Sequence, residues 1–131
     1  MSVNRYYGWY SECGQLDVAV AKLEKDLTRW HERTGKPVFL TEFGAEAIAG
    51  LHQDPPVMFS EEYQAALIER YLDVCARLPF VIGAHVWTFT DFMTKQGVSR
   101  VDGNKKGVFT RDRRPKMAAH LLRKRWAENP I

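Results

Sequence analysis

PVFLTEF, residues 37–43, predicts a buried β-strand that ends on a carboxylate. The apolar run through Val38 and Leu40 is typical of a parallel sheet whose two faces are both covered. Because side chains alternate between the faces of a strand, we expect Val38, Leu40 and Glu42 to share one face. An unpaired charge buried there is costly, so Glu42 is a candidate functional residue. The alternative is a strand-end glutamate that reaches solvent or caps the next turn.

Helices and strands alternate outward from this strand. Apolar residues recur at spacings of three and four from Leu16 to Trp30 and predict a helix over residues 17–33. Gly35 and Pro37 would end it. We expect two further strands, an aromatic one over 3–10 and one over 80–92. A second helix would have Ser60 as its N-cap and a buried stripe of Leu67, Tyr71, Val74, Cys75 and Leu78. A third helix would follow Pro115, with Leu121, Leu122 and Trp126 facing inward. This order indicates parallel βαβ units, so the fold class is α/β.

The number of strands is small for a closed fold of this class. A complete (β/α)₈ barrel needs about 250 residues, whereas this chain has 131 residues and three expected strands. If it comes from such a barrel, it is roughly the second half, and two strand edges are left unpaired. The sequence contains no internal repeat and no low-complexity linker.

The composition argues against several classes of protein. No run of about 18 apolar residues is present, and the first residues lack the apolar segment of a secretory signal. Cys13 and Cys75 are too few for a disulfide framework. We therefore expect no membrane partner and a cytoplasmic, reducing environment. No spacing of His or Cys is typical of a metal site, and we expect no cofactor.

The net charge of +3 conceals an asymmetry. Residues 95–126 contain eleven Lys or Arg and two Asp, a formal charge of +9, whereas the rest of the chain has eight against fourteen, or −6. Such a segment is usually a solvated face, and the alternative is a site for a polyanion. We expect no nucleic-acid partner, because no aromatic residues interleave the basic run as they do in single-strand binders.

Polar residues gather where the expected strands end, which is the edge where parallel α/β proteins bind their ligands. Asn4, Tyr6 and Tyr10 are expected on one face of the first strand, where they would present hydrogen-bonding groups; the alternative is plain aromatic core. The residues expected on one face of the third strand are Gly83, His85, Trp87, Phe89 and Asp91. Of these, Trp87 is a candidate platform for a sugar ring, although a Trp in a strand is more often core.

The loop RVDGNKKGVF, residues 100–109, follows the third strand. Asn104 and Lys106 are two positions apart, so in an extended loop they project the same way. One amide donor beside one ammonium suits a carboxylate ligand. The alternative is a surface turn at Asp102 with two solvated lysines.

Four stretches together resemble the β-glucuronidases of glycoside hydrolase family 2. They are NRYYGWY, TEFGAEAIAG with LHQDPP, VWTFTDF and GNKKGVFTRDRRPK, in this order and at similar spacing. The resemblance covers nearly the whole chain. It implies that residues 1–131 are the carboxy-terminal portion, about the last three β/α units, of a TIM barrel, without its first strands and without the family's amino-terminal β domains. It also implies a glucuronide substrate and a retaining mechanism.

The resemblance assigns roles to individual residues. Glu42 matches the nucleophile, and Tyr6 matches a tyrosine close to it. The implied substrate-binding residues are Asn4, Tyr10, Trp87, Arg100, Asn104 and Lys106, the last three of which match the group that recognises the uronic acid carboxylate. We expect the full-length protein to be a homo-oligomer.

Two departures from the family pattern matter. Phe43 stands where many relatives have tyrosine. The family's general acid/base is a Glu after an Asn near the end of the fourth strand, and this chain has no Asn-Glu dipeptide, so we expect it to be a very poor catalyst alone.

The alternatives to a β-glucuronidase are a related β-galactosidase or galacturonidase of the same family, and a non-catalytic scaffold that binds polyanions.

Overall fold

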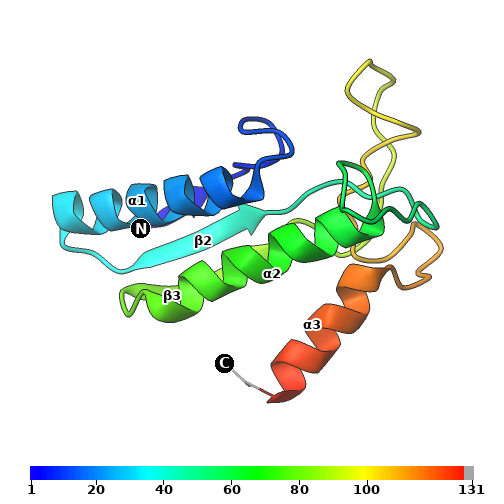
Figure 1. Ribbon diagram of the computed structural model, residues 1–131. Coiled ribbons are helices and arrows are strands. Elements are labelled where there is room, and N and C mark those ends of the chain that lie inside the picture. The colour runs from blue at the N-terminus through cyan, green and yellow to red at the C-terminus, as the bar shows by residue number, and fades with distance from the viewer. Residues whose placement is uncertain (129–131) are drawn as a thin grey trace.

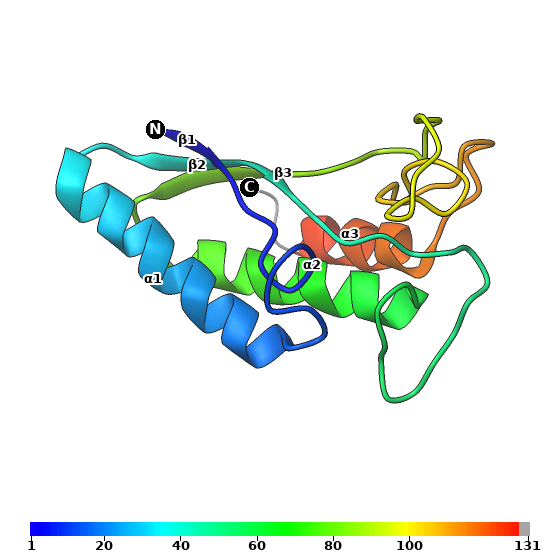
Figure 2. The same cartoon turned by 90° about the horizontal axis from the view of Figure 1, so that it is seen from above.

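Three parallel strands form one sheet in the order β1–β2–β3 in the computed structural model, which describes residues 1–128. The elements in chain order are β1 Ser2–Asn4, α1 Leu16–Thr34, β2 Val38–Phe43, α2 Glu61–Arg77, β3 Val81–Val86 and α3 Met117–Glu128. All three helices lie on the same side of the sheet (Figure 1, Figure 2). This is how strands and helices are layered in a sector of a β/α barrel, so the expected fold class is confirmed.

The limits of α1 and the cap at the start of α2 agree with the prediction from the sequence. Gly35 caps α1 in the left-handed conformation, with φ of 63°, and donates its N–H to the His31 carbonyl at 2.8 Å. The Ser60 hydroxyl accepts the Tyr63 N–H at 3.2 Å and so caps α2. The stripe residues closest to the sheet, such as Leu23 in α1, are fully buried. None of the helices within residues 1–128 has the length and apolar character to cross a membrane.

β1 is shorter than its aromatic pattern predicts. The strand ends at Asn4, and the Tyr6 carbonyl then accepts the N–H groups of Trp9 and Tyr10 at 3.0 and 3.1 Å. Gly8 takes a positive φ of 86° in this turn, and a Cβ there would meet the side chains of α1 and α2 at 3.1 to 3.4 Å. The expected alternation of Asn4, Tyr6 and Tyr10 on one strand face is therefore wrong.

β3 also ends early, at Val86, so the prediction of a strand that runs to residue 92 is wrong. Beyond Val86 the backbone pairs with the following loop: Thr88 donates to the Lys106 carbonyl at 3.0 Å, and Val108 donates to the Thr88 carbonyl at 3.0 Å. These hydrogen bonds set the course of the backbone after Val86. The prediction that Asp91 shares a strand face by alternation is therefore wrong.

β2 breaks its alternation near the site. Its register with β3 shifts between Leu40 and Phe43. Phe43 is buried and stacks on Tyr71 of α2, with ring centroids 5.3 Å apart. Phe43 therefore continues the helix-covered face that Val38 begins, and the prediction that Glu42 shares this face is wrong.

The outer edge of β3 is apolar and open. Within α3, Leu122 is buried, but Trp126 is 45% exposed, so the prediction that Trp126 faces inward is wrong. Trp126 instead borders a hollow of about 610 Å³ together with Phe89 and Phe109. Its ring lacks cover because no described strand lies beyond β3.

A buried ion pair joins the segment after β3 to the start of α3. The Lys116 ammonium donates to Asp91 Oδ1 at 2.8 Å and to the carbonyls of Ala47 and Lys105 at 2.7 and 3.0 Å. Asp91 also accepts the Gly107 N–H at 3.0 Å. Desolvation raises the pKa of Asp91 and lowers the pKa of Lys116, so burial opposes both charges although they are paired. The pair fixes the loop that follows residue 100.

Residues 1–131 on their own should self-associate, because β1 and β3 have unpaired outer edges among the described strands and Ile82 is 65% exposed. Sedimentation velocity should show an average mass above that of one chain, rising with concentration. A charge on β3, Ile82→Lys, should reduce this association. A compact monomer at every concentration would contradict the prediction.

Replacement of Lys116 by Met should lower the free energy of unfolding by about 3–5 kcal/mol, because it leaves the buried Asp91 carboxylate unpaired. Urea unfolding followed by tryptophan fluorescence, at a concentration that keeps the chain monomeric, measures the loss. The double variant Asp91→Asn/Lys116→Met should recover much of it. A double variant as unstable as Lys116→Met would rule out the electrostatic explanation.

Candidate active site

Glu42 and Tyr6 meet where β1 and β2 end. The Tyr6 hydroxyl donates to Glu42 Oε2 at 2.8 Å, and the Glu42 carbonyl accepts the Arg5 N–H at 2.9 Å. Burial first, and then the hydrogen bond to Glu42, raise the pKa of Tyr6, so its hydroxyl stays protonated as a donor. The two predicted neighbours are thus in contact, but a turn brings them together and not a continued strand.

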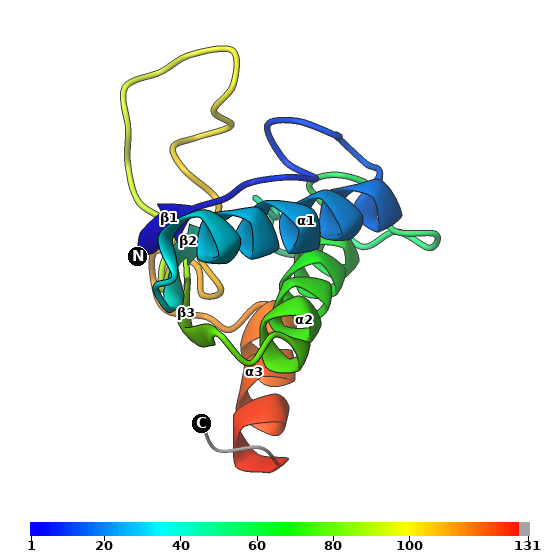
Figure 3. The ribbon, with the colours of Figure 1, turned by 90° about the vertical axis from the view of Figure 1, so that its left-hand side faces the viewer.

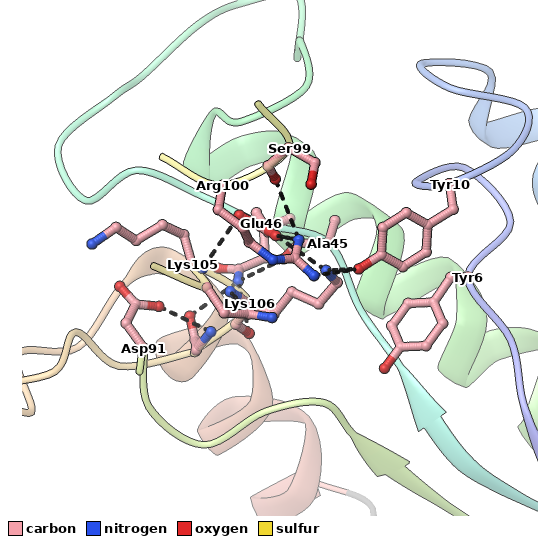
Figure 4. A network of polar contacts seen from close by, with 12 residues as sticks. Tyr6, Tyr10, Ala45, Glu46, Asp91, Ser99, Arg100, Lys105 and Lys106 are labelled. Carbon is pink, nitrogen blue, oxygen red and sulfur yellow. Dashed lines mark hydrogen bonds and ion pairs between the residues drawn. The ribbon is translucent and has the colours of Figure 1, made fainter. Parts of the chain in front are cut away.

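Two cations and a buried carboxylate form a cluster beside this pair (Figure 4). Lys106 and Arg100 both pair with Glu46 Oε1, and the Lys106 distance is 3.2 Å. Both cations also donate to the Tyr10 hydroxyl oxygen, at 2.8 Å from Lys106 and 3.0 Å from Arg100. Partial burial would raise the pKa of Tyr10, but the hydrogen bonds from Lys106 and Arg100 outweigh it, and the pKa is lowered.

Glu46 is a residue that the sequence analysis missed. It is fully buried, and its second oxygen accepts the Lys105 N–H at 3.3 Å. A signal was present in the sequence, since Glu46 is a charge between Ala45 and Ala47 in a segment that continues a buried strand. A carboxylate in such a place needs cationic partners.

The Lys106 side chain is enclosed by aromatic rings. It is 1% exposed, and its ammonium lies 4.5 Å from the ring centroid of Tyr10, 5.3 Å from that of Trp9 and 5.5 Å from that of Tyr6. The ammonium is therefore held by cation–π contacts as well as by Glu46. A surface turn with two solvated lysines is excluded by this burial.

Side-chain amides hold the loop around Lys106. Asn104 is 5% exposed, and its Oδ1 accepts the Lys106 N–H at 2.9 Å. The Gln64 amide of α2 donates to the carbonyls of Lys106 and Gly107 at 3.3 and 3.1 Å. Within residues 1–128 the Asn104 amide nitrogen has no hydrogen-bond partner, which leaves it free to donate to a ligand.

Asn4 and Trp87 lie at the margins of the site. Asn4 is opposite Glu42 in the β1–β2 register, and its Oδ1 accepts the Thr41 hydroxyl at 2.7 Å. Trp87 is 37% exposed, and its backbone N–H donates to the Phe43 carbonyl at 2.8 Å. No hydrogen bond among the described residues joins either side chain to the Glu46 cluster.

The basic segment 95–126 is not one continuous solvated face. Lys106 and Lys116 are buried, and Arg125 pairs with Asp73 at 2.7 Å. Several of its cations are therefore used inside the fold, which weakens the polyanion alternative. Beyond the cluster, the loop that carries Arg100 extends away from the sheet (Figure 3).

Comparisons with known proteins agree with this arrangement. The model of the glycosyl hydrolases family 2, TIM barrel domain, matches residues 1–130. A β-glucuronidase of Paenibacillus borealis is 61% identical over 126 residues, which is 96% of this chain and 21% of that protein.

Solved structures of β-glucuronidases match equally well. The Dictyoglomus thermophilum enzyme superposes with a TM-score of 0.96 at 57% identity, over 98% of this chain and 22% of that one. The Ruminococcus gnavus enzyme in complex with D-glucaro 1,5-lactone has a TM-score of 0.90 at 44% identity, over 95% of this chain and 22% of that one.

The chain spans about a fifth of the length of these relatives. The family match nevertheless covers almost all of it, and the three parallel strands with helices on one side are those of a partial barrel. The chain belongs to glycosyl hydrolase family 2 and forms part of that family's TIM barrel domain.

Proposed function

We propose that the protein to which this chain belongs hydrolyses β-D-glucuronides, with Glu42 as the nucleophile. The observation that carries the proposal is the Glu42 carboxylate at the end of β2, hydrogen-bonded by Tyr6 at 2.8 Å beside the cluster of Lys106, Arg100 and Glu46. The relatives described above, all of them β-glucuronidases, support the substrate class.

The proposed mechanism is a retaining double displacement. A Glu42 oxygen attacks the anomeric carbon while the bond to the leaving oxygen breaks, which gives a glycosyl ester; water then cleaves the ester. Tyr6 keeps the carboxylate oriented by its hydrogen bond. The leaving group needs a proton donor that residues 1–131 do not supply, so the chain alone is a very poor catalyst.

Arg100, Asn104 and Lys106 are proposed to bind the uronic acid carboxylate. A neutral sugar would not leave the Lys106 ammonium unpaired, because Glu46 already pairs with it. The preference for an acid comes instead from the charge of the cluster. Two cations and one anion leave one net positive charge, which a single uronate neutralises.

A complete enzyme for testing is a hybrid in which residues 1–131 replace the matching segment of the Dictyoglomus thermophilum β-glucuronidase. This hybrid should hydrolyse a chromogenic β-glucuronide and release the β-anomer first, as NMR of early product would show. Glu42→Gln should lower kcat by about 10⁴-fold or more, because an amide cannot form the ester. Residues 1–131 alone should give no turnover. Unchanged kcat in Glu42→Gln would refute the assignment of the nucleophile.

Lys106→Met in the hybrid should lower kcat/KM for the glucuronide by about 10–100-fold, because one charged hydrogen bond to the carboxylate is lost. The slow hydrolysis of the matching β-glucoside, which differs only at C6, should fall much less. Lys105→Met is the control, since the Lys105 side chain pairs with exposed Asp102 at 3.1 Å and not with the cluster. Equal losses in the two variants, or equal losses on the two substrates, would contradict the carboxylate role.

A further inference from the structure

We propose that Glu46 is a positioning residue of the carboxylate subsite. It holds the Lys106 ammonium and the Arg100 guanidinium in place while the subsite is empty. The proposal rests on the proposed function, because that function assigns these two cations to the uronic acid carboxylate. Glu46 itself need not touch the substrate.

The geometry joins two segments of the chain through the Glu46 side chain. Glu46 follows β2 by three residues, and its Oε1 pairs with both cations of the loop after β3. Its Oε2 accepts the backbone N–H of Lys105 in that loop at 3.3 Å. Figure 4 shows Glu46 between Arg100 and Lys106, with the Tyr10 hydroxyl on their far side. The carboxylate therefore connects the strand that carries Glu42 to the loop that carries the cations.

Burial makes Lys106 dependent on this carboxylate. The Lys106 side chain is 1% exposed, and within residues 1–128 the partners of its ammonium besides Glu46 are a phenol oxygen and three aromatic rings. Neutral groups recover only part of the cost of removing an ammonium from water. Without Glu46 the buried ammonium would lose its anionic partner and move from its place, and its contribution to substrate binding would be lost.

Glu46 also keeps two like charges together. Lys106 and Arg100 donate to the same Tyr10 oxygen and pair with the same Glu46 oxygen. Removing the anion leaves two cations that repel each other at short range. It also removes an anion that repels the substrate carboxylate, which would favour binding. The first effect is the larger, because Lys106 is buried and charges in a buried site are screened less.

Two lactones that differ only at C6 provide the test. D-Glucaro-1,5-lactone carries a carboxylate there, and D-glucono-1,5-lactone carries a hydroxymethyl group. Calorimetry on the hybrid enzyme gives Kd for each, and their ratio measures the preference for the carboxylate. Glu46→Gln, which removes the charge and keeps the shape, should reduce this preference by about 10–100-fold. Kd for D-glucono-1,5-lactone should change by less than about threefold, within the range of a neutral contact.

Two further variants separate positioning from general folding effects. Glu46→Asp keeps the charge and should lose less of the preference than Glu46→Gln. Glu61→Gln is the matched control, because Glu61 is also buried and accepts the N–H groups of Gly50 and Met117 at 2.7 and 2.6 Å, away from the cations. It should leave the ratio unchanged.

The outcomes are distinct. Tighter binding of the glucarolactone by Glu46→Gln, or equal weakening of both lactones, would overturn the role of Glu46 and leave the proposed function standing. An unmodified hybrid that binds both lactones equally would overturn the carboxylate subsite itself, and with it this proposal. If Glu46→Gln does not fold, an unchanged ratio in Glu46→Asp overturns the proposal, and a reduced ratio supports it.

Discussion

A carboxylate without exposed surface must be compensated by cations, and Glu46 imposes this requirement on the site. Its partners, Lys106 and Arg100, come from a loop more than fifty residues further along the chain. That loop must therefore return to the end of β2. Once it does, Lys106 lies against the aromatic turn after β1, and residues that follow all three strands meet at one site. The electrostatic requirement thus adds to the backbone contact between these segments, in which the Ala47 N–H donates to the Lys105 carbonyl at 3.0 Å.

The path of the loop is maintained by polar groups that are themselves buried. Lys116 and Asp91 hold its backbone from the side of α3, and Gln64 holds it from α2. Polar networks of this kind are costly when one member is missing, because the remaining members stay buried without partners. Residues outside the cluster, such as Lys116 and Gln64, in this way help to position Lys106.

The sequence predicts local features of this fold better than long-range ones. The spacing of Leu23 and Leu27, the cap at Ser60 and the chain's place in its family can all be predicted, because each depends on a local pattern or a motif. Alternation cannot reveal the register shift that turns Phe43 inward, since pairing with β3 sets it. Glu46 was missed because its partners are remote in sequence. The homo-oligomer and the cytoplasmic location stay predictions.

The Tyr10 hydroxyl accepts hydrogen bonds from two cations, so its own proton must point away from both. The same contacts lower the pKa of Tyr10. Tyr10 is 57% exposed and can therefore take two charge states at the edge of the cluster. As a phenol it offers a donor and leaves the cluster positive, and as a phenolate it would cancel the remaining charge. Ionisation of Tyr10 in alkaline solution would thus weaken the attraction of the cluster for acids without any change in the shape of the site.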